Sequence, residues 1–162
     1  MSTTKKTVLI TGGASGIGLG TVKYLLNKGN HEVISFSRGA GHIEEAKKKL
    51  GDRAQEVLFL QGDISSEADV QKLYEEIESR YGKLDGLVNS AGVMKLGGVE
   101  EQSLEEWRRV VDTNLTSVFL MVKTMLPLLK KGTNASIVNL SSLNARRPGG
   151  SAAYCASKAG VE

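Results

Sequence analysis

Short apolar runs alternate with longer segments in which apolar residues recur every three or four positions. The runs are rich in β-branched and aliphatic residues and have the length of buried strands. They cover residues 7–10, 33–36, 57–60, 84–88 and 137–140. Strands that alternate with helices form right-handed βαβ units, in which helices cover both faces of a parallel sheet. The pattern therefore predicts an α/β fold with a doubly wound parallel sheet in the strand order 3-2-1-4-5.

Three predicted helices follow the first three strands. The first covers residues 16–28 and a shorter one covers residues 43–50. The third covers residues 66–81, with Ser66 as its N-cap and Gly82 as its stop signal. In the first helix, the residues expected to face the sheet are Ile17, Val22, Leu25 and Leu26. In the third, they are Val70, Leu73, Tyr74 and Ile77.

A long helix is predicted to begin after Ser103. The Ser103 hydroxyl and the Glu106 carboxylate have the spacing of a capping box. Pro127 should kink or end this helix, because proline lacks the N–H that the helical ladder needs. Its inward residues are expected to be Leu104, Trp107, Val110, Val111, Leu115, Val118, Phe119 and Val122.

Composition and charge narrow the class of protein. The chain has 162 residues, a formal net charge of +3 and one cysteine, Cys155. Its small, mixed charge argues against nucleic-acid binding, and a single cysteine cannot form an internal disulfide. No apolar stretch is long enough for a membrane span. We therefore expect one domain over residues 1–162, a cytoplasmic location, and no nucleic acid, membrane or metal as a partner.

Glycine is in excess, and a dense cluster of it follows the first strand. The chain has 19 glycines, where average usage predicts about 11. Gly12, Gly16 and Gly18 have the spacing Gly-x-x-x-Gly-x-Gly between a strand and a helix. Glycines there let backbone N–H groups approach a pyrophosphate, and the helix N-terminus attracts its charge. The turn favours a Rossmann-type dinucleotide site over a purely structural turn, and the lack of a Gly-Lys-Ser/Thr sequence argues against a P-loop.

The end of the second strand bears on the choice of cofactor. An acidic residue about 20 positions beyond the glycine turn would bind the ribose of NAD, whereas an arginine accommodates the 2′-phosphate of NADP. Here the strand ends in Ser37 and Arg38. The guanidinium offers a forked, permanently charged set of donors, and the serine adds a hydroxyl. NADP(H) is therefore favoured over NAD(H), with an exposed loop arginine as the alternative interpretation. The lack of an acid also argues against a methyltransferase.

Tyr154 and Lys158 are four residues apart. On a helix such residues share one face, so the lysine ammonium would lie beside the tyrosine phenol. A tyrosine ordinarily exchanges its proton near pH 10, and a neighbouring positive charge makes the phenolate easier to form. The pair would then serve as a general acid or base. Taken alone, this spacing is common by chance, and its meaning depends on the other motifs.

Together these motifs resemble those of the short-chain dehydrogenases/reductases, in the same order along the chain. The residues that carry the resemblance are Thr11, Gly12, Gly16, Gly18, Asp63, Asn89, Ser90, Ala91, Gly92, Asn114, Ser141, Ser142, Tyr154 and Lys158. The resemblance covers essentially the whole chain. One departure is Ser90, where the family often has a second asparagine. The resemblance implies a Rossmann fold and a nicotinamide cofactor.

The resemblance also implies a role for each matched residue. Asp63 would hydrogen-bond the adenine amino group, and Ile64 would pack beside the ring. Tyr154 would exchange a proton with the substrate oxygen, while Lys158 binds the nicotinamide ribose and Asn114 links it through water to a proton relay. The implied cofactor-binding residues are Gly12, Ser15, Gly16, Ile17, Gly18, Ser37, Arg38, Asp63, Ile64, Asn89, Ala91, Gly92, Tyr154 and Lys158. The implied catalytic residues are Asn114, Ser142, Tyr154 and Lys158.

The catalytic serine is either Ser141 or Ser142. Alignment of the strand at 137–140 with the family pattern selects Ser142, which then lies one residue closer to Tyr154 than the family's usual spacing. Ser141 satisfies that spacing but shifts the strand by one residue, which turns its side chains to the other face. A one-residue deletion in the loop 146–150 costs little by comparison. We therefore favour Ser142.

The sequence thus predicts an oxidoreductase that transfers a hydride between NADP(H) and a small-molecule carbonyl or secondary alcohol. The alternative is a dinucleotide-binding fragment or sensor module with impaired or no catalysis. Family members continue beyond the Tyr-x-x-x-Lys helix with further strands and a substrate loop. We therefore expect this chain to lack the C-terminal strands, to bind NADPH weakly and to turn over little. A homodimer or homotetramer is implied for a full-length protein.

Overall fold

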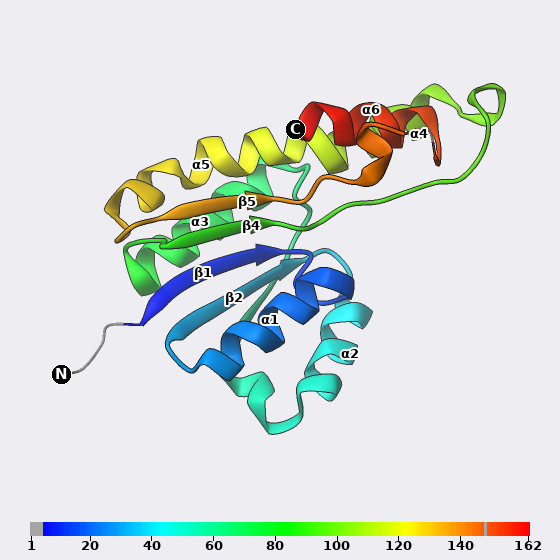
Figure 1. Cartoon of the computed structure of the whole chain (residues 1–162). Helices are drawn as coiled ribbons and strands as arrows, with labels where there is room; N and C mark the ends of the chain where they lie inside the picture. Colours follow the sequence, from blue (N-terminus) through cyan, green and yellow to red (C-terminus); the bar gives the residue numbers. More distant parts are fainter. Residues whose placement is uncertain (1–4, 148) are drawn as a thin grey trace.

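The computed structural model describes residues 5–147 and 149–162. Its centre is a parallel five-stranded sheet in the order β3-β2-β1-β4-β5, which confirms the predicted order (Figure 1). Each strand begins and ends within two residues of its predicted bounds. The strands are β1 (Lys6–Thr11), β2 (His31–Ser37), β3 (Val57–Gln61), β4 (Gly86–Asn89) and β5 (Ser136–Asn139).

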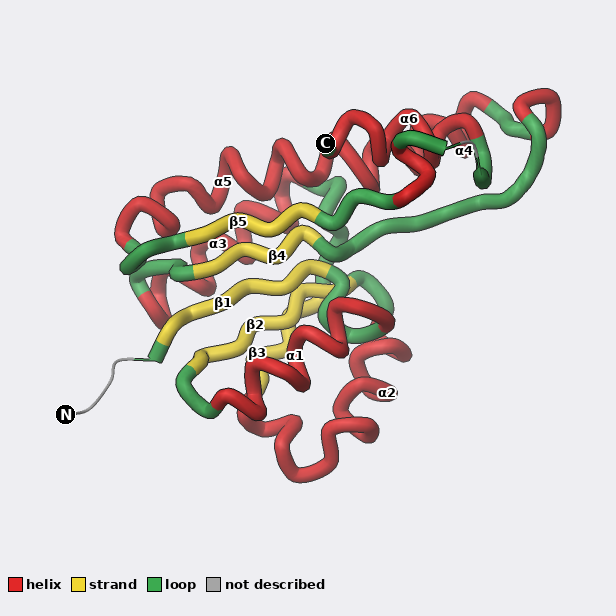
Figure 2. The backbone as a smooth tube through the Cα atoms, in the orientation of Figure 1, coloured by secondary structure: helices red, strands yellow, loops and turns green. Residues whose placement is uncertain are grey.

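Helices cover both faces of the sheet (Figures 1 and 2). Helices α1 and α2 pack on one face, and α3 and α5 pack on the other. Helices α4 and α6 pack against each other beyond the carboxyl ends of β4 and β5. The helices are α1 (Gly16–Lys28), α2 (Ala40–Leu50), α3 (Glu67–Tyr81), α4 (Leu104–Val111), α5 (Ser117–Lys131) and α6 (Ala152–Val161). A π-helical turn covers Asp112–Thr116, and 3₁₀ turns cover Gly51–Glu56, Val99–Glu101 and Leu143–Ala145.

The side chains of β1 alternate between the two faces of the sheet. Leu9 packs with residues of α3 and α5, among them Ile77 and Met121. Val8 and Ile10 pack with residues of α1 and α2 on the opposite face. Because helices cover both faces, the central strands are buried at almost every position. This explains why the runs in the sequence are continuous rather than alternating.

The predicted helix signals have the expected geometry. Ser66 Oγ accepts a hydrogen bond from the backbone N–H of Asp69 at the start of α3, and Gly82 has a left-handed φ of 65° at its end. Ser103 and Glu106 form both halves of the capping box before α4. Each polar side chain satisfies a backbone donor that the first helical turn leaves free. Both predicted starts are confirmed.

Four side chains that were expected to be buried are exposed. Their exposed fractions are 71% for Ile17, 62% for Leu104, 38% for Trp107 and 65% for Phe119. The prediction for the long helix assumed one continuous period of 3.6 residues. The π-helical turn Asp112–Thr116 interrupts that period and shifts the inward face of α5, which accounts for the exposure of Phe119. Ile17 is exposed because it lines the cleft at the start of α1. Met121 and Met125 are buried in α5 in place of Phe119.

Pro127 does not end α5, so termination of the helix at this residue was a wrong prediction. The helix continues to Lys131. A proline leaves the carbonyl four residues earlier, here that of Lys123, without its helical donor. Both Pro127 and Lys123 are exposed. Water can therefore supply the hydrogen bond that the proline does not make.

Candidate active site

A cleft of about 430 Å³ opens at the carboxyl edge of the sheet. The loops after β1, β2, β3 and β4 all contribute to it. This is the edge at which ligands bind to doubly wound sheets, where the strand order reverses. The residues that line the cleft are Gly12, Ala14, Ser15, Gly16, Ile17, Phe36, Ser37, Arg38, Gly39, His42, Gly62, Asp63, Ile64, Ser90, Ala91, Gly92, Val93 and Thr113.

Two glycines allow the turn between β1 and α1 to pack closely. Gly12 has a φ of +68°, and a Cβ on it would lie 2.9 Å from the Cα of Ala91. A Cβ on Gly18 would lie 2.3 Å from the carbonyl oxygen of Gly12. Both distances are too short for any side chain. Gly18 therefore acts through packing of α1 against the turn, and it does not itself line the cleft.

Hydroxyl groups hold the loops of the cleft together. Thr11 Oγ1 accepts 3.1 Å hydrogen bonds from the backbone N–H groups of Ser90 and Ala91. Ser37 Oγ accepts a 3.2 Å bond from the N–H of Ala14. A hydroxyl that accepts still has its own proton to donate. Ser37 can therefore support the glycine turn and donate to a ligand at the same time.

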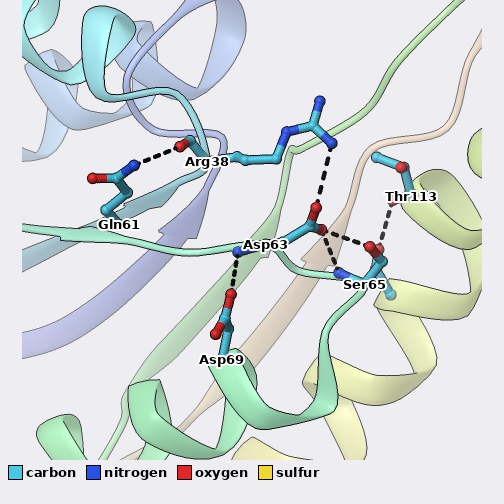
Figure 3. A network of polar contacts seen from close by, with 7 residues as sticks. Arg38, Gln61, Asp63, Ser65, Asp69 and Thr113 are labelled. Atoms are coloured by element: carbon cyan, nitrogen blue, oxygen red, sulfur yellow. Dashed lines mark hydrogen bonds and ion pairs between the residues drawn. The ribbon is translucent and has the colours of Figure 1, made fainter.

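Arg38 and Asp63 face each other in the cleft (Figure 3). Arg38 Nη1 lies 3.3 Å from Asp63 Oδ2, and Asp63 Oδ1 accepts hydrogen bonds from the N–H and the hydroxyl of Ser65. Gln61 Nε2 donates to the Arg38 carbonyl, and Asp69 Oδ2 accepts from the Asp63 N–H. Burial raises the pKa of Asp63, but the hydrogen bonds from Ser65 and Arg38 outweigh burial and hold that pKa below its usual value. Asp63 is therefore a carboxylate at neutral pH.

The π-helical turn carries Asn114 into the interior, beside the loop after β4. Asn114 is 1% exposed. Its Oδ1 accepts a 2.8 Å hydrogen bond from the Val93 N–H, and its Nδ2 donates to the Val93 carbonyl and to Ser157 Oγ. Asn114 thus connects the loop after β4 to α6. Such turns are rare and are frequently found at functional sites.

Lys158 lies beside the same loop. Its side chain is buried, and Nζ donates a 2.7 Å hydrogen bond to the Leu140 carbonyl. A Cβ on Gly92 would lie 3.4 Å from Asn114 Oδ1 and 3.6 Å from Lys158 Nζ. The two polar groups therefore border one point of the cleft wall. Burial lowers the pKa of Lys158.

Tyr154 lies in the first turn of α6. Ser151 Oγ accepts from the Tyr154 N–H, and Gln102 Oε1 accepts from the Ala153 N–H. These contacts fix the start of the helix against the segment before α4. None of the four predicted catalytic residues, Asn114, Ser142, Tyr154 and Lys158, is among the residues that line the cleft, but Asn114 and Lys158 lie directly beside Gly92, which does line it.

The two candidate serines have different hydrogen-bond partners. Ser141 Oγ donates to the Lys158 carbonyl at 3.0 Å. Ser142 Oγ accepts from the Asn144 N–H at 3.2 Å and so retains a proton that it can donate. Pro148, in the loop where we expect the deletion, lies outside the described residues.

Sequence reasoning missed several residues of the cleft, and four of the predicted cofactor-binding residues do not line it: Gly18, Asn89, Tyr154 and Lys158. Asn89, predicted to bind the cofactor, is buried and donates a 2.8 Å hydrogen bond to Asn139 Oδ1, which joins β4 to β5. His42 lines the cleft one helical turn after Arg38. Its position four residues beyond the predicted phosphate ligand was the available signal. The other missed residues are Ala14, Phe36, Gly39, Gly62, Ser90, Val93 and Thr113.

The described residues of the cleft fit a nicotinamide dinucleotide. The glycine turn and the N-terminus of α1 present backbone N–H groups to a pyrophosphate. Gly16, which lines the cleft with a φ of +51°, has nothing within 4 Å of the place where a Cβ would lie, so its backbone is open to a ligand. Ser37 and Arg38 add donors for a negatively charged group on the adenosine ribose. The donor set matches a long anionic ligand.

Comparison with known proteins gives the same class. The family model for "short chain dehydrogenase" matches residues 6–162. The chain therefore belongs to the short-chain dehydrogenase family.

Two relatives and one solved structure illustrate the similarity. The chain is 38% identical over 160 residues to the 2,5-dichloro-2,5-cyclohexadiene-1,4-diol dehydrogenase of Sphingobium indicum, covering 96% of this chain and 62% of that protein. It is 37% identical over 158 residues to a 3-beta-hydroxysteroid dehydrogenase of Comamonas testosteroni, covering 96% of this chain and 60% of that protein. The crystal structure of a short chain dehydrogenase from Bacillus anthracis superposes with a TM-score of 0.87 at 30% identity, over 96% of this chain and 65% of that one.

The chain thus spans about three fifths of the length of these two relatives. Within the part that the structure describes, no helix is long and apolar enough to cross a membrane.

Proposed function

We propose that this protein transfers a hydride between NADP(H) and a small-molecule carbonyl or secondary alcohol. One observation carries the proposal. A single cleft runs from the glycine turn and Arg38 to Gly92, where Asn114 and Lys158 border its wall. One end of the cleft has the chemistry to bind the phosphates of a dinucleotide, and the other end borders groups that can move protons.

The catalytic roles follow from the groups available. Bound nicotinamide supplies or accepts the hydride. Tyr154 exchanges the proton with the substrate oxygen, and Ser142 donates a hydrogen bond to the same oxygen. Lys158, buried and hydrogen-bonded to the Leu140 carbonyl, binds the nicotinamide ribose and supports the phenolate of Tyr154. Asn114 holds the loop after β4. The family resemblance also assigns to Asn114 a water that would connect Lys158 to solvent.

The preference for NADP(H) rests on Ser37 and Arg38. Both line the cleft where the adenosine ribose would bind. The Arg38 side chain is 59% exposed, so it can turn toward a phosphate without a large desolvation cost. No acidic residue follows β2 directly, as NAD binding would favour. The same proposal includes a cytoplasmic location and a homodimer or homotetramer for the full-length protein.

Replacement of Tyr154 by phenylalanine tests the proposal. We expect Tyr154→Phe to leave NADPH affinity within about twofold of the wild type, because the phenol hydroxyl acts on the substrate. Hydride transfer, followed as loss of NADPH absorbance at stoichiometric protein with a panel of ketones, should fall at least about 100-fold.

Tyr24→Phe is the matched control, since Tyr24 is an exposed tyrosine of α1 outside the cleft. It should change neither quantity. Turnover by Tyr154→Phe at the wild-type rate would contradict the assignment of Tyr154. NADH binding as tight as NADPH binding would contradict the cofactor preference.

A further inference from the structure

His42 occupies a defined place in the cleft. It lies in the first turn of α2 and lines the cleft together with Ser37, Arg38 and Gly39. Its ring is folded back over the start of the helix, because a Cβ placed on Gly39 would lie 3.0 Å from His42 Nδ1. The imidazole therefore lies beside Gly39, two residues after the end of β2.

Only small residues lie between Arg38 and His42 in the sequence. The intervening residues are Gly39, Ala40 and Gly41, so no side chain larger than a methyl group separates the two. The described backbone turns into α2 at Ala40, which places the two side chains on one stretch of the cleft wall. Both side chains therefore line the same cleft.

The electrostatic surroundings favour an anion at this place. The first turn of α2 contains no acidic residue, and its N-cap, Gly39, has no side chain to accept from the free N–H groups. Among the described residues that line the cleft, Asp63 is the only acidic one, and its charge is paired with Arg38. The Arg38 guanidinium, the Ser37 hydroxyl and the His42 imidazole all line the cleft near the N-terminus of α2. The charge of Asp63, the acidic residue of this lining, is already paired with Arg38.

We propose that His42 is a specificity residue that, with Ser37 and Arg38, binds the phosphate by which NADP differs from NAD. This inference rests on the proposed function, because it names a further determinant of the same cofactor site. An imidazole N–H donates one hydrogen bond to a phosphate oxygen. Hydrogen bonds to charged groups contribute enough to change affinity about tenfold.

The experiment compares two ligands that differ only in that phosphate. Adenosine 2′,5′-bisphosphate and adenosine 5′-monophosphate are titrated into the full chain by isothermal calorimetry. We expect His42→Ala to weaken the bisphosphate about five- to tenfold and the monophosphate less than twofold. His42→Arg should strengthen the bisphosphate, because a permanent charge replaces the imidazole.

Two controls separate a specific contact from a general effect. Lys48→Ala removes an exposed cation from the opposite end of the same helix and should change neither affinity. Arg38→Ala should weaken the bisphosphate and provides a positive control. Melting temperatures equal to that of the wild type show that each variant is folded.

The possible outcomes have different meanings. If His42→Ala leaves bisphosphate affinity unchanged while Arg38→Ala reduces it, the inference about His42 is overturned and the proposed function stands. If His42→Ala weakens both ligands equally, the residue has no role in specificity, and the inference is again overturned. If the wild type binds neither ligand, the proposed function itself fails, and the inference fails with it.

Discussion

The Arg38 guanidinium is paired with the Asp63 carboxylate at 3.3 Å. A phosphate that binds Arg38 must therefore compete with that carboxylate. The pair is partly exposed, with side-chain exposures of 59% and 31%, so its own contribution is about 1 kcal/mol or less. The competition is modest, but it acts directly on the residue that would distinguish the two nicotinamide cofactors.

Asp63→Asn tests this competition. The asparagine keeps an oxygen that can accept from an adenine amino group but removes the charge that holds Arg38. We expect the ratio of bisphosphate to monophosphate affinity to rise about threefold, because about 1 kcal/mol or less of pairing is lost. Asp52→Asn, at an exposed position outside the cleft, is the control. A lower ratio in Asp63→Asn would show that the carboxylate helps Arg38 rather than competing for it.

The sequence was enough to predict that Arg38 and Asp63 lie at the same edge of the sheet, but it did not predict which groups they contact. Arg38 and Asp63 each follow a predicted strand, so parallel topology placed both at one edge of the sheet. Their mutual pairing and the folded-back ring of His42 depend on side-chain rotamers. Rotamers respond to neighbours that come from distant parts of the chain. The pattern of apolar and polar residues in the sequence therefore does not predict these rotamers.

At the scale of elements, α1 depends on one close contact with the turn that precedes it. A Cβ on Gly18 would lie 2.3 Å from the Gly12 carbonyl oxygen, whereas a Cβ on Gly20 meets nothing within 4 Å. Both glycines lie in the same helix. They differ only in what surrounds them.

Alanine at these two positions should have opposite effects. Gly18→Ala should lower the free energy of unfolding by about 2–3 kcal/mol, because the helix must move away from the turn. Gly20→Ala should raise it by about 0.5–1 kcal/mol through better helix propensity. Urea denaturation followed by circular dichroism measures both. Equal destabilisation by the two substitutions would show that the close contact with Gly12 does not distinguish Gly18 from Gly20.

The helices also show which features the 3.6-residue period of apolar side chains predicts and which it does not. Caps at Ser66 and Ser103 were predictable because each depends on residues within three positions. The π-helical turn Asp112–Thr116 was not, since no local sequence rule signals the wider turn, and its contact through Asn114 to Val93 is long-range. The exposure of Phe119 follows directly from that missed turn.

At the scale of the whole molecule, Asp85 secures the edge of the sheet opposite the cleft. Its side chain is fully buried, and it accepts hydrogen bonds from the backbone N–H groups of Thr7 and Thr133 at 2.8 and 2.7 Å. Lys83 Nζ lies 2.9 Å from its Oδ2. Burial raises the pKa of Asp85, but the bonds from Thr7, Thr133 and Lys83 outweigh burial and lower it. One carboxylate thus connects the start of β1, the start of β4 and the turn before β5.

Removal of this carboxylate should be costly at neutral pH. Asp85→Ala leaves two backbone donors without a partner, so we expect a loss of about 3 kcal/mol in the free energy of unfolding. A carboxyl whose pKa is lower in the folded state stabilises the fold above its unfolded pKa of about 3.9. That contribution disappears as the pH falls through the lower, folded value. The difference between wild type and variant should therefore shrink below about pH 4.

Urea denaturation at pH 7 and at successively lower pH checks this expectation. Asp52→Ala, at an exposed position, should match the wild type throughout. A difference between Asp85→Ala and the wild type that stays constant into acid would show that the lost carboxylate contributes through packing rather than charge.

The π-helical turn also marks a place where the chain cannot lose a residue without a change in its packing. Deletion of one residue from Asp112–Thr116 would merge α4 and α5 into one regular helix and rotate α4 by about 100° about its axis. Helix α4 packs against α6, so this rotation would separate α6 from Asn114. A gap in an alignment at this turn would therefore mark a relative whose active-site geometry has changed, even if every motif residue were retained.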